Sequence, residues 1–370
     1  MKVLFAANYP SPYRVDFFNE LGKLCELDVV FEERPEAQTH RDGEWFHTNY
    51  DNFEPAFLRQ SVSRNGHCIV SFEILKVLKR KKYDAVIFGV YSTWTQMLGI
   101  KYMQMRGQPY WISSDGGMAK SGRGLREKIK KALIGRACGY FSPSDITDRY
   151  LEFYGADAKK IFRYPFTSLM RRDILNAPVS FEEKRERKRR LGMVPGRAAV
   201  TVGQFIPRKG FDLLLRAVPL AAEDIHYYFI GGNATEEYLS LSRQLGIADR
   251  VHFVGFRKQE ALADYYRAAD FFVLPTREDI WGLVVNEAMA NGLPVVTTDR
   301  CVAGLELVRN GETGLIAESG NIADLARAID DVAGWNGSAS RRCLDVISQY
   351  TLEKMAEVHF SILSMRLDGK

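Results

Sequence analysis

The chain has 370 residues, too many for one ordinary hydrophobic core, and suits two domains of about 150 to 200 residues each. Hydrophobic residues make up 46% and charged residues 26%, so both domains can bury a core and intrinsic disorder is not expected. The formal net charge of +5 hides local basic excesses at 76–82, 122–140 and 182–190. We therefore expect basic patches and no nucleic-acid partner.

The cysteines and histidines follow no metal-site or disulfide pattern. The five cysteines form no C-x-x-C pair and the six histidines form no H-E-x-x-H motif, so we expect no metal site and a reducing compartment. The apolar run at 3–7 is too short for a secretion signal, and no run reaches the length of a membrane span. These features predict a cytoplasmic protein, or one at the inner face of the cell membrane.

In the first half of the chain, short apolar runs alternate with longer amphipathic ones, which is typical of parallel α/β architecture. Residues 35–70 are the exception, because they are polar and aromatic and have no clear periodicity. We expect them to form an excursion without assignable elements. The predicted strands of this half are 3–7, 27–31, 85–89, 110–114, 140–142 and 160–164.

A charged segment at 180–190 separates the halves, and a second series of strands follows it. These strands are predicted at 199–204, 227–231, 251–255, 271–275, 294–298 and 314–317. Each half is expected to form a Rossmann-like doubly wound parallel sheet, with a ligand at the carboxyl ends of the strands. We expect the first domain with its linker to span 1–190 and the second to span 191–345.

The first strand of the second series leads into a short basic loop. Gly203 ends the strand, and Arg208, Lys209 and Gly210 precede a helix expected at 211–218. A glycine permits close approach of a ligand to the backbone. A helix N-terminus with two adjacent cations suits a diphosphate whose negative charge grows as it leaves. On this stretch alone, a solvated basic loop is the alternative.

A second feature follows the strand at 271–275. Residues 282–290 have the pattern of a helix with an Asn-Gly stop, and Asp279 lies before its N-terminus. Glu287 lies five residues beyond Gly282, about 7 Å along a helix axis. Two acids so placed can bind hydroxyls at opposite ends of one ligand while the helix N-terminus holds phosphates. Taken singly, each acid is better explained as a helix cap or an ordinary helical glutamate.

A third feature is the glycines at two further strand ends. Gly231 and Gly232 follow one strand, and Gly255 with Phe256 follows the next. Glycines at these positions allow a base or a ribose to lie against the backbone. Alone, they are turns.

Taken together, these motifs resemble glycosyltransferase family 4. The ordered set is Gly-x-x-x-x-Arg-Lys-Gly, Phe-Ile-Gly-Gly, Val-x-Phe-x-Gly and acid-x-Trp-Gly-Leu-x-x-x-Glu-Ala-Met-Ala-x-Gly-x-Pro-Val-Val. The resemblance is close over 203–314 and covers the whole chain in layout. It implies a retaining, nucleotide-sugar-dependent enzyme of GT-B fold, in which two Rossmann-like domains face each other across a cleft. It also implies a last helix, within 346–370, that crosses back onto the first domain.

The resemblance assigns roles to single residues of the second domain. Arg208 and Lys209 would bind the donor diphosphate, and Glu287 would bind the ribose hydroxyls. The amides of Gly282 and Leu283 would face phosphate.

The family's acid-x7-acid motif usually begins with Glu, and this chain departs from it. Asp279 is in register and would contact the transferred sugar, whereas Glu278 is an acid one residue out of register. The following Trp281-Gly282-Leu283 run favours Asp279 as the sugar-binding acid. Glu278 remains the alternative.

The first domain offers two acceptor candidates. Tyr13 and Arg14 follow the first strand in a loop with prolines, where family members often have a glycine-rich turn, and the pair can stack on a sugar and hold an anionic group. Asp115 ends a central strand where the family often has a histidine, so it is a candidate catalytic or acceptor-orienting carboxylate. The alternatives are a rigid turn for the first pair and a turn aspartate for Asp115.

The basic segments also lie in this half. Residues 124–136 have apolar positions at helical spacing, with Arg126, Lys128, Lys130 and Lys131 among the residues on the other surfaces. Such a helix can lie on an anionic membrane surface, helped by the basic residues at 79–82. The alternative is an amphipathic helix with a solvated basic face.

The sequence therefore predicts a glycosyltransferase that moves a sugar from a nucleoside-diphosphate sugar to a glycan or lipid-linked oligosaccharide acceptor in cell-surface polysaccharide synthesis. Because no D-x-D metal motif is present, we expect no cofactor besides the donor. The alternatives are a nucleotide-sugar epimerase on the same fold and a non-catalytic nucleotide-sugar-binding subunit.

Overall fold

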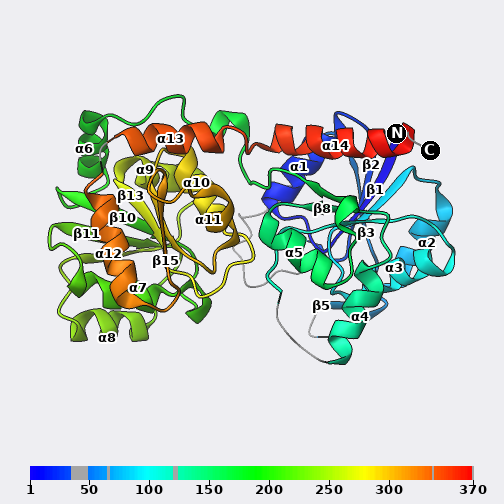
Figure 1. Ribbon diagram of the computed structural model, residues 1–370, viewed down its shortest axis with the longest axis horizontal. Coiled ribbons are helices and arrows are strands. Elements are labelled where there is room, and N and C mark those ends of the chain that lie inside the picture. The colour runs from blue at the N-terminus through cyan, green and yellow to red at the C-terminus, as the bar shows by residue number, and fades with distance from the viewer. Residues whose placement is uncertain (35–48, 65–66, 120–123, 336, 369–370) are drawn as a thin grey trace. The chain divides into compact units, whose positions relative to one another are not determined.

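The computed structural model describes residues 1–34, 49–64, 67–119, 124–335 and 337–368. Its internal contacts divide the chain into two units, the first formed by Met1–Ser168 with Thr351–Lys370 and the second by Leu169–Tyr350. Each unit contains a parallel sheet with helices packed on it (Figure 1). Both sheets confirm the Rossmann-like architecture expected from the alternating pattern.

The first unit has a seven-stranded sheet of order β3-β2-β1-β6-β7-β8-β9, and every pairing in it is parallel. Its strands are β1 (Lys2–Ala7), β2 (Glu26–Phe31), β3 (Glu54–Phe57), β6 (Ala85–Phe88), β7 (Trp111–Ser113), β8 (Gly139–Ser142) and β9 (Ile161–Arg163). Its helices are α1 (Pro12–Gly22), α2 (Glu73–Arg80), α3 (Trp94–Met105), α4 (Leu125–Ile134) and α5 (Asp145–Phe153), with the C-terminal helix described below.

All six strands predicted for this half are present. The excursion at 35–70 contains three strands that the pattern did not place: β3 at the sheet edge and the antiparallel pair β4 (Val62–Arg64) and β5 (His67–Val70). Positions 35–48 and 65–66 of that excursion lie outside the described residues.

The second unit has a six-stranded parallel sheet of order β12-β11-β10-β13-β14-β15. Its strands are β10 (Arg197–Val202), β11 (Ile225–Ile230), β12 (Val251–Val254), β13 (Phe271–Leu274), β14 (Val295–Thr298) and β15 (Gly314–Ala317), at all six predicted places. Its helices are α6 (Phe181–Arg190), α7 (Phe211–Ala217), α8 (Glu236–Gln244), α9 (Gln259–Ala268), α10 (Leu283–Ala290), α11 (Val302–Leu307), α12 (Ile322–Ala333) and α13 (Ser338–Ile347).

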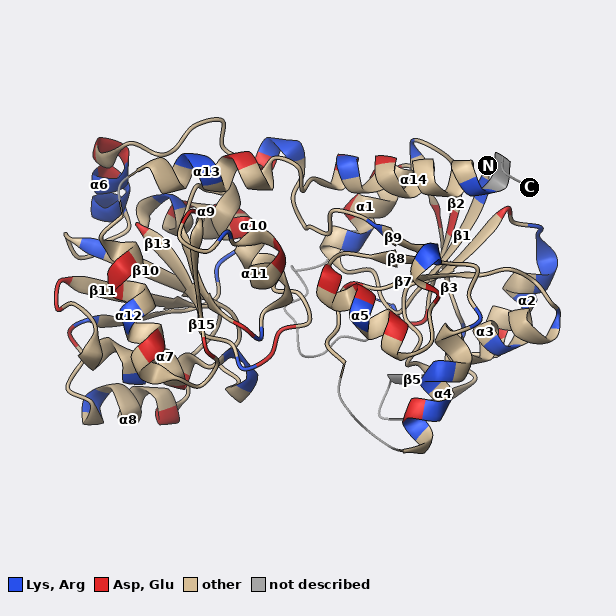
Figure 2. Ribbon diagram, viewed as in Figure 1, with Lys and Arg blue, Asp and Glu red and all other residues tan. Residues whose placement is uncertain are grey.

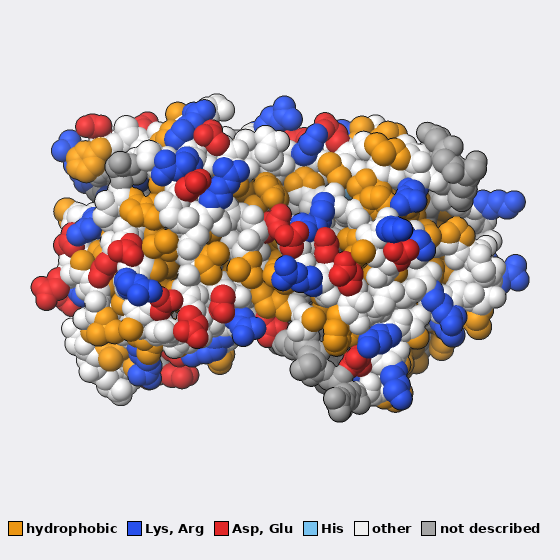
Figure 3. Space-filling view, viewed as in Figure 1, with side chains coloured by type: hydrophobic (Ala, Val, Ile, Leu, Met, Phe, Trp, Pro, Cys, Tyr) orange, Lys and Arg blue, Asp and Glu red, His pale blue; other side chains and the backbone are white. Residues whose placement is uncertain are grey.

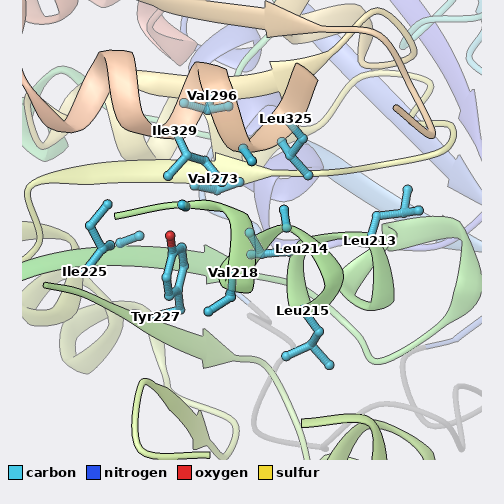
Figure 4. Packing of buried hydrophobic residues seen from close by; sticks show 14 of the residues in the cluster. Leu213, Leu214, Leu215, Val218, Ile225, Tyr227, Val273, Val296, Leu325 and Ile329 are labelled. Carbon is cyan, nitrogen blue, oxygen red and sulfur yellow. The ribbon is translucent and has the colours of Figure 1, made fainter. Parts of the chain in front are cut away.

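Continuous apolar runs explain why these strands are buried. In β13 all four residues are at most 1% exposed, as expected for a parallel strand covered on both faces. On one face, Leu214 of α7, Val273 of β13 and Ile329 of α12 belong to a single core cluster (Figure 4). This packing fixes the positions of the loops that follow β10 and β13.

The charged segment at 180–190 forms α6 and belongs by its contacts to the second unit, although the sequence analysis assigned it to the first domain and its linker. Its basic side chains reach acids of that unit: Lys188 Nζ lies 2.7 Å from Asp270 Oδ2, and Arg187 lies 2.6 Å from Asp264. A helix that packs through ion pairs has no apolar stripe, so its sequence has the composition of a linker.

The C-terminal helix α14 (Leu352–Asp368) packs against α1, so the chain ends in the first unit (Figure 1). Its His359 is fully buried against the rings of Phe17, Phe141 and Tyr164. The ring Nδ1 lies 2.8 Å from the carbonyl of Met355. Among the described residues, no helix has the length and apolarity to cross a membrane.

We expect the stability of the chain to fall as the pH drops from about 6.5 toward 4, because burial lowers the pKa of His359 from its ordinary 6.5 to about 4. In that window the unfolded chain binds a proton that the folded chain does not, which favours unfolding. The variant His359→Phe removes this contribution. Thermal denaturation at pH 7 and pH 5 should therefore show a smaller loss of melting temperature in the variant than in the wild type. Equal losses of melting temperature in both proteins would contradict the assignment of this pH dependence to His359.

Candidate active site

An ion pair joins the loops that follow β10 and β13, which are neighbouring strands of the second sheet. Lys209 Nζ lies 2.6 Å from Asp279 Oδ2, and an Arg208 guanidinium nitrogen lies 3.4 Å from Asp279 Oδ1. Asp279 is 6% exposed, so its carboxylate is largely removed from water and held by two cations. The structure thus brings together residues of two motifs that lie about 70 positions apart in the sequence.

Main-chain and side-chain hydrogen bonds fasten the two loops to each other. The Arg208 carbonyl accepts from the Arg277 amide and from the Thr276 hydroxyl, each at 2.9 Å. The Arg277 guanidinium donates two hydrogen bonds of 2.7 Å to the carboxylate of Asp212, at the start of α7. A bidentate Arg–carboxylate pair is geometrically specific. It therefore helps to fix the backbone that carries Arg208 and Lys209.

Gly210 permits the close approach of these loops. Its φ is +70°, in the left-handed region, and a Cβ at this position would lie 2.0 Å from the carbonyl oxygen of Pro275. Only glycine meets both conditions without displacing the loop after β13. The glycine after Arg208-Lys209 is therefore a packing requirement of the site.

The backbone around Asp279 is itself fixed by hydrogen bonds. Its amide donates to the Arg300 carbonyl at 2.8 Å, and its carbonyl accepts from the Val302 amide at 3.2 Å. In this arrangement the Asp279 side chain faces Lys209, and the preceding Glu278 offers its backbone carbonyl to Arg208 at 2.9 Å. Asp279 therefore presents its carboxylate to the two cations, whereas Glu278 contributes its backbone carbonyl.

The helix predicted at 282–290 is α10, and it begins at Leu283 after Gly282. Trp281 is 2% exposed, and its indole N–H donates to Asn286 Oδ1 at 2.9 Å. Its ring lies in the core, so the contribution of Trp281 is to hold the N-terminus of α10. The amides of Gly282 and Leu283 lie at this N-terminus, where an anion is favoured.

Glu287 lies about one helical turn after Leu283 on α10, in surroundings that change the pKa of its carboxyl. Burial raises the pKa of its carboxyl to about 7, although the Tyr266 hydroxyl and the charge of Lys209 act in the opposite direction. The hydroxyl of Tyr266, from α9, donates to Glu287 Oε2 at 3.0 Å. Tyr266 could not be identified from the sequence, because an aromatic residue in an amphipathic helix gives no sign of which group its hydroxyl will contact.

The predicted glycines lie at the ends of the adjacent strands β10, β11 and β12. The Gly203 amide donates to the Ile230 carbonyl at 2.9 Å, and a Cβ on Gly231 would lie 2.2 Å from the Gly203 oxygen. Gly232 follows at once, and Gly255 and Phe256 follow β12, with the Phe256 side chain 47% exposed. The three strand ends therefore offer accessible backbone and one exposed ring at the same edge of the sheet.

In the first unit, the structure brings Tyr13 and Arg14 of α1 onto Asp115 at the end of β7. Arg14 lies 2.5 Å from Asp115 Oδ2, and the Tyr13 hydroxyl donates to the same oxygen at 3.2 Å. The Arg14 side chain is 9% exposed, whereas that of Asp115 is 21% exposed. Residues about 100 positions apart thus form one polar cluster at the carboxyl edge of the first sheet.

A further buried acid, which the sequence analysis missed, lies at the same edge after β2. Glu32 is 5% exposed, and its Oε1 accepts from the Thr93 hydroxyl at 2.6 Å and from the side-chain amide of Gln96 at 2.9 Å. Burial raises the pKa of this carboxyl. Within the described parts of both units, no group of three or more His, Cys, Asp or Glu residues is arranged to hold a metal ion.

Residues 196–334 match the model of the family described as Glycosyl transferases group 1. Among curated proteins, the chain is 39% identical over 158 residues to a D-inositol 3-phosphate glycosyltransferase of Rhodococcus erythropolis, covering 38% of this chain and 35% of that protein. It is 28% identical over 172 residues to the lipopolysaccharide core biosynthesis glycosyltransferase LpsE of Rhizobium meliloti, covering 45% and 49%. The chain spans about a third to a half of the length of these curated relatives.

Two of the solved structures that resemble this chain cover it almost completely. Anabaena Alr3699/HepE in complex with UDP superposes with a TM-score of 0.79 at 16% identity, covering 99% of this chain and 100% of that one. Sucrose-phosphate synthase of Thermosynechococcus elongatus superposes with a TM-score of 0.75 at 18% identity, covering 100% and 99%. These superpositions confirm the predicted GT-B fold class.

Gly210→Ala should destabilise the chain more than a glycine replacement at an equally left-handed but open position. Gly246, at the end of α8, has a φ of +67°, and a Cβ added there would have no neighbour within 4 Å. Gly246→Ala should therefore cost about 1–2 kcal/mol of backbone strain alone. Gly210→Ala adds the clash with Pro275. Urea denaturation of both variants measures the difference in the free energy of unfolding. If both variants lose the same free energy, the loops after β10 and β13 can separate without cost.

Proposed function

Because residues 196–334 match the model of glycosyl transferases group 1, we propose that this chain is a retaining glycosyltransferase. It transfers a sugar from a nucleoside-diphosphate sugar to a hydroxyl of a glycan or lipid-linked acceptor. The observation that carries the proposal is the Lys209–Asp279 pair, with Arg208 beside it, at the strand ends of the matched region. This arrangement supplies cations for a leaving diphosphate and a carboxylate for sugar hydroxyls.

In the proposed reaction, Arg208 and Lys209 neutralise the charge that develops on the departing diphosphate. The N-terminus of α10 provides a further anion-binding position, and Glu287 accepts hydrogen bonds from the ribose. Asp279 exchanges its partner: when the diphosphate takes Lys209, the carboxylate becomes available to the hydroxyls of the sugar. Since the chain's own cations supply the positive charge, we propose no cofactor besides the donor. Because HepE binds UDP, a UDP-sugar is the first donor to test.

The first unit is proposed to hold the acceptor. The cluster of Tyr13, Arg14 and Asp115 offers a carboxylate whose orientation is fixed by two donors, and it can accept a hydrogen bond from an acceptor hydroxyl. Asp115 would therefore orient the attacking group. The names of the two curated relatives, one acting on an inositol phosphate and one in lipopolysaccharide core synthesis, support a polyhydroxyl acceptor in cell-surface glycan synthesis.

We further propose that the first unit binds the inner face of the cell membrane through α4. Lys130 lies over the rings of Tyr150 and Tyr154, and Lys131 pairs with Glu127 at 3.0 Å. Arg126 and Lys128 are exposed, and Leu125 beside them is 74% exposed. Figure 2 shows basic residues along α4. Elsewhere on the face in Figure 3, acidic and basic side chains are interspersed. An exposed apolar residue next to two cations suits an anionic lipid surface.

Asp279→Ala should reduce UDP release from a UDP-sugar at least 100-fold, because it removes the carboxylate that contacts the sugar. Glu278→Ala should stay within a few-fold of the wild type. Steady-state assays over a panel of UDP-sugars, with and without glycan acceptors, measure both. Donor consumption also separates an enzyme from a binding subunit, and the products separate a transferase from an epimerase. Near-normal turnover by Asp279→Ala would contradict the assignment of the acid.

For the membrane, the double variant Arg126→Gln/Lys128→Gln should bind anionic vesicles less tightly by about 2 kcal/mol, at roughly 1 kcal/mol per cation. Sedimentation with phosphatidylglycerol vesicles, compared with neutral phosphatidylcholine vesicles, is the measurement. The control Arg243→Gln/Arg327→Gln removes the same charge from exposed sites of the second unit. If the two double variants sediment alike, α4 is not the membrane-binding element.

A further inference from the structure

Tyr266 is the one tyrosine for which the described residues show a hydrogen bond to an acid of the donor site. Its side chain is 2% exposed, and its hydroxyl donates to Glu287 Oε2 at 3.0 Å. A buried tyrosine hydroxyl requires a partner, and here the partner is a carboxylate. The bond joins α9, which precedes β13, to α10, which follows it.

The same pair of helices is joined a second time. Arg267, next to Tyr266, donates through Nε to Asn291 Oδ1 at 3.0 Å, and the Asn291 side-chain amide donates to the Glu287 carbonyl at 2.9 Å. Consecutive residues of α9 therefore hold Glu287 by its carboxylate and, through Asn291, by its main chain. A side chain fixed at both ends cannot turn freely to meet a ligand.

We propose that Tyr266 is a positioning residue for nucleotide binding, which orients the Glu287 carboxylate as the acceptor for two ribose hydroxyls. The inference rests on the proposed function, because it takes the ribose as the ligand of Glu287. Glu287 Oε2 accepts the hydrogen bond from the Tyr266 hydroxyl, and this contact sets the orientation of the carboxylate. Tyr266 itself need not touch the nucleotide.

The protonation of Glu287 gives this arrangement a measurable signature. The groups that act on its carboxyl are Tyr266 of α9 and Lys209 of the loop after β10, which favour the charged form, and Asp173 and burial, which oppose it. The resulting pKa is about 7. A carboxylate accepts hydrogen bonds from both hydroxyls of a ribose, whereas the protonated acid carries a donor in place of one acceptor site. Nucleotide affinity should therefore fall as the pH drops from 8.5 to 6.

Removal of the Tyr266 hydroxyl should change that profile in two ways. Tyr266→Phe keeps the buried ring but loses a hydrogen bond to a charged group, so the midpoint of the profile should move upward by about one pH unit. The affinity at high pH should also fall several-fold because the carboxylate is no longer oriented. Glu287→Gln should bind weakly and lose the midpoint at about pH 7, keeping only the pH dependence that the terminal phosphate of UDP contributes at about pH 6.

The experiment is calorimetric titration of UDP into the intact chain at pH values from 6 to 8.5. The matched control is Tyr228→Phe, because Tyr228 is a buried tyrosine of the same unit whose hydroxyl accepts from the Val194 backbone amide and is not among the groups that act on Glu287. It should leave the midpoint where the wild type has it. An unmoved midpoint in Tyr266→Phe, even with a uniform loss of affinity, would overturn the inference while the proposed function stands. Failure of the wild type to bind UDP, GDP or dTDP at any pH would overturn the proposed function and this inference with it.

Discussion

The site of the second unit depends on the burial of the Asp279 carboxylate between two cations. A carboxylate taken out of water destabilises the fold unless charged or hydrogen-bonding partners replace its hydration. Lys209 and Arg208 fill that role, and they can do so because β10 and β13 are neighbours whose loops end at the same sheet edge. Under the proposed function, the contact that stabilises the folded site is also the contact that an entering diphosphate would replace.

Around this pair, the rest of the site is held by residues that need not touch a ligand. Arg277 and Asp212 fasten the backbone of Arg208, and Gly210 allows the two loops to meet. On α10, the side chain of Glu287 is held from α9. The candidate donor site is therefore assembled from several loops and helices of the second unit.

The strands and the main motifs could be predicted from the sequence because they depend on local pattern. A run such as Phe271-Phe272-Val273-Leu274 is buried wherever it is placed, and Arg208-Lys209-Gly210 carries its chemistry in adjacent residues. The pairing of Asp212 with Arg277 and the contact of Tyr266 with Glu287 join residues 65 and 21 positions apart, and only the sheet order brings them together. The strand β3 could not be predicted either, because it is a four-residue edge strand without the continuous apolar run of a buried strand.

The most direct test of the account is a crystal structure of the chain with UDP. We predict that the diphosphate lies within hydrogen-bond distance of Lys209 Nζ and at the N-terminus of α10. The ribose hydroxyls should contact Glu287, and the Asp279 carboxylate should be turned away from Lys209. A structure in which UDP binds elsewhere while Lys209 and Asp279 keep their contact would contradict it.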